Sequence, residues 1–321
     1  LKYETIMINC NPETVSTDPD TSDRLYFEPL IDEYVQNIIL KEKSKGSLLG
    51  VIAQFGGQTP LKLASSIENV MGTHHSAIDI CEDREKFNSL VKDINGKQPP
   101  GRTALNLSQA WEIKEELGLP LLVRPSYVLG GKCMNICWTD EEFENAAIKA
   151  LEVSDGKPLL VDKYLDYAAE YDLDLVSDGE SVCIAAIMEH IEEAGIHSGD
   201  SSCVIPTINL SQKIKSKMEK WSTSIAIKLN VIGLMNIQFA VKDDTVFIIE
   251  ANPRASRTVP FISKAYKQPY VNFATKVMLG KNKLKDFKFD PKLDGFAIKQ
   301  PVFSFSKFPN VDKSLGPEMK S

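Results

Sequence analysis

The sequence predicts an α/β region followed by a larger α+β region. Over the first 80 residues, short apolar runs alternate with helical stretches, which is the βαβ pattern of a parallel sheet. From about residue 83, helical stretches flank pairs of apolar strands joined by turns that contain Gly or Asp, the pattern of antiparallel hairpins. A chain of 321 residues is long enough for two such domains.

The first region contains two expected strand–helix units. Residues 4–11 form an apolar strand that runs into a loop rich in Asn, Pro, Ser, Thr and Asp, and residues 31–43 carry apolar side chains at helical spacing. A second strand over 48–57 ends in Gly56-Gly57 and precedes a helix from about Pro60. The sequence contains no GxGxxG segment, so the dinucleotide-binding fingerprint is missing.

The second region is expected to be richer in strands. Apolar periodicity predicts helices over 83–95, 107–117 and 212–230. Three strand pairs are expected to turn at Gly130-Gly131, at 177–180 and near 243–245. Hairpins of this kind build antiparallel sheet, so the region reads as α+β rather than as a continuation of the parallel sheet.

Composition narrows the class of partner. A net charge of −7 and a pI near 5.3 weigh against nucleic acid, although local cations and backbone amides can still hold a phosphate. The longest apolar run, 182–188, is too short to cross a bilayer. Six scattered cysteines without a CxxC pair indicate free thiols in a reducing compartment. We therefore expect a cytoplasmic protein, with mitochondrial import left open because the sequence begins at Leu1.

The last hairpin carries the strongest candidate for a metal site. Eleven residues separate Gln238 from Glu250, and a three-residue turn centred on Asp244 would place these two side chains directly opposite each other. Asn252 would then follow two residues further along the same face, whereas a two-residue turn would put Gln238 and Glu250 on opposite faces. A row of side-chain oxygens suits Mg²⁺ or Mn²⁺. The alternative is a set of solvated side chains at a strand end.

Cations and small residues near this hairpin suggest a phosphate ligand. Arg254 and Arg257 follow the metal candidates at once, and arginine suits planar anions and transferring phosphoryl groups. Glycines at 130 and 131, with Arg124 before them, could let backbone amides approach an anion, although these residues taken alone favour a plain hairpin turn with surface cations. A Ser/His/Asp triad within 197–201 is disfavoured because no GxSxG elbow is present.

Several long segments together resemble carbamoyl-phosphate synthetase large subunits. They occur in that family's order from residue 3 to residue 319, and they include NCNPETVSTDPDTSDRLYFEPL, QFGGQTPLKLA, VRPSYVLGG, MEHIEEAGIHSGDSS and EANPRASRTVPFISKA. Residues 11–18, NPETVSTD, resemble the carboxy-terminal half of that subunit, which phosphorylates carbamate, rather than the half that phosphorylates bicarbonate.

The resemblance implies a domain order. It implies a truncated pre-ATP-grasp (Rossmann-like) domain over 1–82 without its first strand, and an ATP-grasp fold over 83–285. Residues 286–321 would lead towards an allosteric domain. The family's opening RIGQG segment is absent from this sequence.

The resemblance also implies a set of site residues. The phosphoryl-side arginines would be Arg124, Arg254 and Arg257, and the metal ligands would be Gln238, Glu250 and Asn252. The residues implied to bind ATP are Arg84, Arg124, Gly130, Gly131, Lys163, Leu165, Glu170, Gly195, Ile196, His197, Ser198, Gln238 and Glu250.

The function implied by the resemblance is phosphorylation of carbamate by ATP with Mg²⁺ or Mn²⁺, within carbamoyl-phosphate synthesis for pyrimidine or arginine production. Its implied partners are an amino-terminal synthetase half and a glutaminase subunit or domain, with no nucleic acid and no membrane. One alternative is another ATP-grasp ligase, either a carboxylate-amine ligase or a biotin-carboxylase-like enzyme, that forms a different acyl phosphate. A nucleotide-binding module without turnover is disfavoured because Glu250, Asn252 and Arg254 are all retained.

Overall fold

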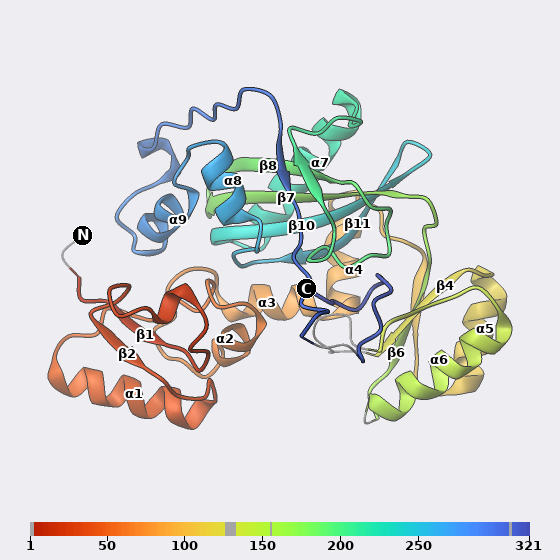
Figure 1. Ribbon diagram of the computed structural model, residues 1–321, viewed down its shortest axis with the longest axis horizontal. Helices are drawn as coiled ribbons and strands as arrows, with labels where there is room; N and C mark the ends of the chain where they lie inside the picture. The colour runs from red at the N-terminus through yellow and green to blue at the C-terminus, as the bar shows by residue number, and fades with distance from the viewer. Residues whose placement is uncertain (1–2, 126–132, 155, 308–309) are drawn as a thin grey trace.

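The computed structural model describes residues 3–125, 133–154, 156–307 and 310–321. Within these residues the strands form a parallel pair, a four-stranded sheet and a six-stranded sheet. Figure 1 shows the parallel pair at one end of the molecule, the four-stranded sheet at the other end, and the six-stranded sheet above both. Helices α3 (His75–Glu82) and α4 (Arg84–Asp93) run between these parts.

The N-terminal region, residues 3–82, is only partly as the sequence predicts. Strand β1 (Ile6–Ile8) pairs in parallel with β2 (Arg24–Tyr26), and α1 (Asp32–Lys45) buries Val35, Ile38 and Ile39 of its expected apolar stripe but leaves Ile31 and Tyr34 exposed. The strand predicted over 48–57 is wrong: it is reduced to one parallel bridge between Val51 and Val70, because Val51 pairs with the short segment 69–71 instead of with β1. The remaining short helices are η1 (Val15–Thr17) and α2 (Gln58–Leu63).

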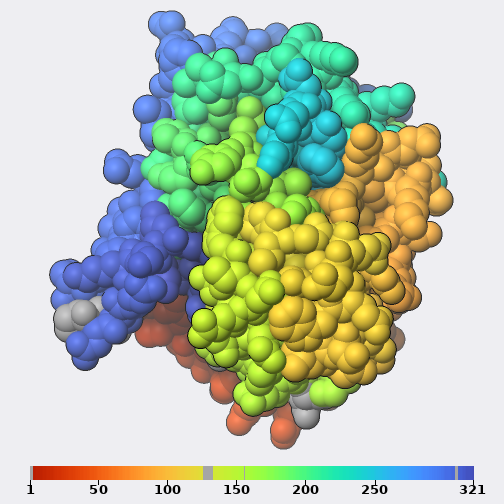
Figure 2. Space-filling model, turned by 90° about the vertical axis from the view of Figure 1, so that its right-hand side faces the viewer, coloured from red at the N-terminus to blue at the C-terminus, as the bar shows by residue number. Residues whose placement is uncertain are grey.

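The four-stranded sheet forms its own lobe. Its order is β3-β6-β4-β5, with bounds β3 (Gly101–Ala104), β6 (Leu159–Lys163), β4 (Leu121–Pro125) and β5 (Asn135–Cys137). Helices α5 (Leu107–Leu117) and α6 (Asp140–Val153) cover one face and bury Leu121, Val123 and Phe143. Figure 2 shows this lobe, in yellow to yellow-green, with the dark-blue C-terminal residues beside it. Because side chains alternate along β4, Arg124 points away from this core.

The six-stranded sheet supports most of the molecule. Its order is β11-β10-β7-β8-β9-β12, and its bounds are β7 (Ala169–Asp178), β8 (Val182–His190), β9 (Cys203–Ile205), β10 (Ile232–Lys242), β11 (Thr245–Asn252) and β12 (Ala297–Lys299). Helices α4 and α7 (Gln212–Lys228) pack on one face, whereas α8 (Val259–Ala265) and α9 (Tyr270–Met278) pack on the other, near η2 (Leu284–Asp286). Burial of alternate strand residues beneath α4 and α7 leaves the intervening polar residues on the opposite face.

The predicted pairing of Gln238 with Glu250 is confirmed, but the predicted turn is wrong. The turn has two residues, Asp243 and Asp244, both with positive φ, and Lys242 pairs with Thr245. A bulge between Gln238 and Phe239 then shifts the register by one residue, so that Gln238 still faces Glu250. The two-residue turn alone would place Gln238 and Glu250 on opposite faces of the hairpin. The bulge adds one residue to the register, and this brings both side chains back to the same face.

Packing rather than covalent cross-links holds the described residues together. All six cysteines are free thiols, of which Cys137 and Cys203 are buried and Cys10 is exposed. Among the described residues, no helix combines the length and the apolar character needed to cross a bilayer. The largest fully buried side chains, such as Phe143, Phe239 and Tyr270, come from both sheets and the helices that cover them.

Candidate active site

The candidate metal ligands form a row at the end of the β10–β11 hairpin. Gln238 lies opposite Glu250, and Asn252 lies on the same face of β11. The Asn252 Nδ2 donates to Glu250 Oε1 at 2.8 Å, and the Gln238 Nε2 donates to Ser198 Oγ at 2.9 Å. Because each amide nitrogen already donates, each amide oxygen is the end left for a cation. One carboxylate with two amide oxygens is a donor set that fits Mg²⁺.

The loop that contains Gly195, Ile196, His197 and Ser198 packs beside this row. Gly195 has a φ of 103°, and a Cβ there would lie 2.5 Å from the Tyr164 hydroxyl, so this close approach requires glycine. Burial lowers the pKa of His197, and its Nδ1 accepts the Gly199 N–H at 3.0 Å. These contacts leave no Ser/His/Asp relay, because His197 Nδ1 bonds to backbone.

The C-terminal residues contact the same loop. The Gly316 carbonyl accepts the His197 N–H at 2.8 Å. The fully buried Asp200 carboxylate accepts the backbone N–H groups of Lys320 and Ser321 at 2.6 and 2.8 Å. The segment 316–321 is therefore part of the wall around this loop in the structure.

Two arginines of the predicted site, Arg254 and Arg257, follow directly after the end of β11. Burial lowers the pKa of Arg254, and the Glu250 charge opposes that shift. The Arg254 Nη1 donates to the Ala255 carbonyl at 3.0 Å, whereas its buried Nε has no protein partner in the described part of the chain. Arg257 Nη1 lies 2.8 Å from Met319 Sδ. Each guanidinium therefore retains donors for an anion near the carboxylate–amide row.

Two further cations, one on α4 and one on β4, meet at a carboxylate of the four-stranded sheet. Arg84 on α4 and Arg124 on β4 share the buried carboxylate of Asp162 on β6, with Arg124 Nη2 3.6 Å from Asp162 Oδ2. Burial lowers the pKa of Arg84, and Asp162 counteracts this. The Nε atoms of both arginines are buried without a partner among the described residues. The single negative charge of Asp162 therefore faces two positive charges, and the excess positive charge is available to bind a phosphate.

A cavity of about 170 Å³ brings part of the two sets of residues together, but Gln238, Arg254 and Arg257 are not among its lining residues. Its lining includes Arg84 and Arg124 from one side and Glu250 and Asn252 from the other. Residues of the N-terminal region, including Gln58 and Lys62, close it. Gly130 and Gly131 were expected beside this space, and they lie outside the described residues.

The residues expected around adenine and ribose lie away from that cavity. Lys163 Nζ donates to the Gly118 and Leu119 carbonyls at 3.0 and 2.9 Å, and Leu165 is partly exposed. Burial raises the pKa of Glu170 to about 7, and His190 opposes this shift from 4.0 Å. Glu170 nevertheless lies close to the carboxylate–amide row, because it is two residues from Asp172, which pairs with Gln238, and the Glu250 charge also raises its pKa.

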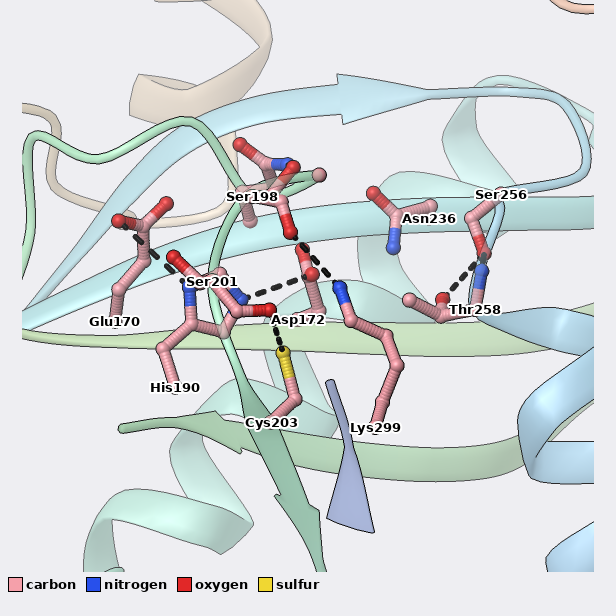
Figure 3. Close-up of polar contacts among 12 residues, drawn as sticks. Glu170, Asp172, His190, Ser198, Ser201, Cys203, Asn236, Ser256, Thr258 and Lys299 are labelled. Atoms are coloured by element: carbon pink, nitrogen blue, oxygen red, sulfur yellow. Dashed lines mark hydrogen bonds and ion pairs between the residues drawn. The ribbon is translucent and has the colours of Figure 1, made fainter. Parts of the chain in front are cut away.

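Sequence reasoning named Glu170 but missed the buried carboxylates of Asp162, Asp172 and Asp174. Figure 3 shows Glu170 and Asp172 of β7 around His190, whose Nε2 lies 3.0 Å from Asp172 Oδ2. Asp174 follows on the same face, and Asp162 links the two arginines. The signal was present, because the segment 170–175 (EYDLDL) places a carboxylate at every second position of a strand that is otherwise apolar.

Comparisons with known proteins cover the whole chain. A family model described as "Carbamoyl-phosphate synthase L chain, ATP binding domain" matches residues 83–286, and one described as "Carbamoyl phosphate synthase preATP-grasp domain" matches residues 1–82. The carbamoyl phosphate synthase large chain of Archaeoglobus fulgidus is 53% identical over 325 residues, which are 99% of this chain and 30% of that protein. The carbamoyl phosphate synthase large chain, C-terminal section, of Methanocaldococcus jannaschii is 50% identical and covers 99% of this chain and 54% of that protein.

Solved structures with the same fold are more distant in sequence. The biotin carboxylase domain of Hydrogenobacter thermophilus 2-oxoglutarate carboxylase, complexed with MgADP and bicarbonate, has a TM-score of 0.73 at 18% identity, covering 92% of this chain and 68% of its own. N5-carboxyaminoimidazole ribonucleotide synthetase from Thermus thermophilus has a TM-score of 0.72 at 15% identity, covering 99% and 85%. The two family models and the close relatives show that this chain belongs to the carbamoyl-phosphate synthase large-chain family, with a pre-ATP-grasp domain followed by an ATP-grasp domain.

Proposed function

We propose that this chain is an ATP-dependent ligase component that phosphorylates carbamate, giving carbamoyl phosphate and ADP. The observation that carries the proposal is the row of Gln238, Glu250 and Asn252, which lies on one strand pair directly before Arg254 and Arg257. A hard cation and an anionic substrate could therefore bind side by side. Phosphoryl transfer needs mainly this positioning and charge neutralisation, with little covalent work by the protein.

In this proposal each group of side chains binds a different part of the metal–nucleotide complex. Gln238, Glu250 and Asn252 hold the metal, and Mg²⁺ or Mn²⁺ bound there would neutralise charge on the phosphates. Arg84 and Arg124 bind phosphate oxygens from the opposite side of the cavity. Lys163, Leu165, Glu170 and the loop at 195–198 hold the nucleoside end.

The arginines after β11 act on the transferred group. Arg254 and Arg257 stabilise the negative charge that develops on the transferring phosphoryl group, because both follow the row directly in sequence and the Glu250 charge acts on Arg254. Gly130 and Gly131 are proposed to cover the phosphates. In all of these roles the protein orients reactants and keeps their charges paired.

The choice of carbamate rests on likeness to the second synthetase half. The relative from Methanocaldococcus jannaschii is named as a C-terminal section, and residues 11–18 carry the signature of that half. The curated relatives are longer than this chain, which covers 30% and 54% of the two compared above. We therefore propose that an amino-terminal synthetase half and a glutaminase act with it, and that residues 286–321 lead towards a further domain. The complete reaction would make carbamoyl phosphate from bicarbonate, ATP and either glutamine or ammonia.

The reverse reaction gives the sharpest test. The purified chain is incubated with ADP, carbamoyl phosphate and Mg²⁺, and ATP is measured with luciferase beside the Glu250→Ala variant. We expect ATP from the wild type and a loss of about a hundredfold to a thousandfold in the variant, as for removal of a group that stabilises transition-state charge. A matched control is Glu180→Ala, which changes an exposed glutamate in the β7–β8 turn.

The outcomes separate the alternatives. ATP formation that persists in Glu250→Ala would remove Glu250 from the metal site. If the folded wild type forms no ATP from carbamoyl phosphate but hydrolyses ATP when bicarbonate or another carboxylic acid is supplied, the chain is a different ATP-grasp ligase. Such an enzyme would form another acyl phosphate, as in the biotin-carboxylase-like alternative.

A further inference from the structure

The segment that carries both arginines, Pro253–Thr258, is held from one side by Asp174 of β7. Asp174 is fully buried, and its Oδ1 accepts Ser256 Oγ–H at 2.6 Å while its Oδ2 accepts Thr258 Oγ1–H at 2.5 Å. Asn236 Nδ2 donates to the same carboxylate at 3.2 Å. Figure 3 shows Asn236, Ser256 and Thr258 gathered at one point on the sheet.

A second buried side chain holds the other end of this segment. Gln54, from the N-terminal region, is 1% exposed, and its Nε2 donates to the Pro253 carbonyl at 2.6 Å. The Gln54 backbone carbonyl accepts the Ala255 N–H at 3.0 Å. Thr73 fixes the amide of Gln54, because its Oγ1 accepts Gln54 Nε2–H at 2.8 Å and its backbone N–H donates to Gln54 Oε1 at 3.2 Å.

The two contacts bracket the two arginines in sequence. Arg254 lies between Pro253 and Ala255, which both bond to Gln54, and Arg257 lies between Ser256 and Thr258, which both bond to Asp174. Fixing the residues on either side of an arginine limits the backbone angles that set the direction of its side chain. Asp174, Gln54 and the two arginines are not among the residues that line the cavity, whereas Pro253, at the start of the segment, is. Asp174 and Gln54 therefore act on the segment and not directly on a ligand in the cavity.

We propose that Asp174 and Gln54 are positioning residues, which form a two-sided clamp that aims Arg254 and Arg257 at the anionic substrate. The inference rests on the proposed function for the identity of that substrate, carbamoyl phosphate in the reverse direction. It also gives the N-terminal region a part in the reaction. Gln54 reaches across 199 residues of sequence to the arginine segment and joins the two regions at the site.

The test compares two buried aspartates of the same strand. Asp174→Asn keeps the size of the side chain but turns one acceptor oxygen into a donor that faces a hydroxyl. Asp178→Asn is the matched control, because Asp178 is also buried on β7 yet accepts backbone N–H groups of Glu180, Ser181 and Leu284. Gln54→Met removes the side-chain bond to the Pro253 carbonyl at similar volume and leaves the backbone bond between the Gln54 carbonyl and the Ala255 N–H.

For Asp174→Asn and Gln54→Met we expect kcat/KM for carbamoyl phosphate to fall about tenfold to a hundredfold, as for small misplacements of catalytic groups. The KM for ADP should stay within about twofold, because a binding defect confined to the arginines leaves the nucleoside end intact. The Asp178→Asn control should leave both values unchanged. Equal losses in Asp174→Asn and Asp178→Asn, or an unchanged kcat/KM in Asp174→Asn, would overturn the clamp.

Hydrogen–deuterium exchange tests the clamp without any turnover. The amides of Ala255 and Thr258 should exchange about tenfold faster in Asp174→Asn or Gln54→Met than in Asp178→Asn, as local opening becomes easier. If the wild type makes no ATP while this difference appears, the proposed function fails and the clamp stands. If Asp174→Asn does not fold, Ser256→Ala removes one bond of the same clamp, and unaltered exchange in that variant would refute the inference.

Discussion

The two sides of the cavity hold their charged groups in different ways. On the side of the six-stranded sheet, Gln238, Glu250 and Asn252 are placed by strand register, and amide hydrogen bonds fix two of them. On the side of the four-stranded sheet, Arg84 and Arg124 depend on one shared carboxylate, that of Asp162. The first arrangement distributes its constraints over many backbone contacts, whereas the second concentrates them in a single residue. A single substitution should therefore damage the second side more.

The largest effect is expected at Asp162. Asp162→Asn removes the buried charge that two partly buried guanidinium groups share, and leaving a buried ion pair without one partner costs about 3–5 kcal/mol. Urea denaturation should show that decrease in the free energy of unfolding, and the KM for ADP in the reverse reaction should rise. A decrease below about 1 kcal/mol would show that the cationic side does not depend on this residue, and the comparison between the two sides would fail.

The next effect concerns pH on the side of the six-stranded sheet. Burial raises the pKa of Asp174 to about 6, although hydrogen bonds from Ser256 and Thr258 oppose the shift. The folded protein then binds this proton more tightly than the unfolded chain does. The stability that protonation contributes is full below the ordinary value of 3.8 and is lost as the pH rises through about 6.

Asparagine does not titrate, so it provides the reference for this effect. The wild type should lose about 1.4 kcal/mol relative to Asp174→Asn between about pH 5 and about pH 8, since one pKa unit corresponds to about 1.4 kcal/mol. Urea titrations of both proteins at the two pH values measure this difference. A constant difference would mean that the Asp174 carboxyl keeps one protonation state over this range.

A third change tests the contact that joins the two sides. Tyr164 follows β6 of the four-stranded sheet, and its hydroxyl donates to the Ala194 carbonyl at 2.6 Å, directly before the loop at 195–198. Tyr164→Phe should cost about 1 kcal/mol of stability, the usual net value of one hydrogen bond. We expect about a fivefold higher KM for ADP with kcat nearly unchanged, because the loop is proposed to hold the nucleotide. An unchanged KM would separate this loop from nucleotide binding.

The sequence predicted the elements better than it predicted the contacts between them. The hairpin pairing of Gln238 with Glu250 follows from strand alternation, although the bulge that maintains it has no sequence signal that we recognised. The strand expected over 48–57 is missing because its partner segment is short. Gln54 and Pro253 are 199 residues apart, so their contact depends on how the two regions pack. Local patterns contain no such information, and for the same reason the role of Asp162 was missed, whereas the alternation of carboxylates in 170–175 was a local signal for Asp174 that we did not use.

The smallest effect is expected for an exposed ion pair on the four-stranded lobe. Arg102 and Glu116 lie 2.7 Å apart, but their side chains are 60% and 56% exposed, so water and salt screen the attraction. Glu116→Gln should therefore change the free energy of unfolding by less than about 0.5 kcal/mol and leave ATP formation unaltered. Asp162, like Glu116, is a carboxylate paired with arginine, but its side chain is buried. If Glu116→Gln and Asp162→Asn had equal costs, burial would not be what makes the shared carboxylate important, and strand geometry would have to position both sides of the cavity.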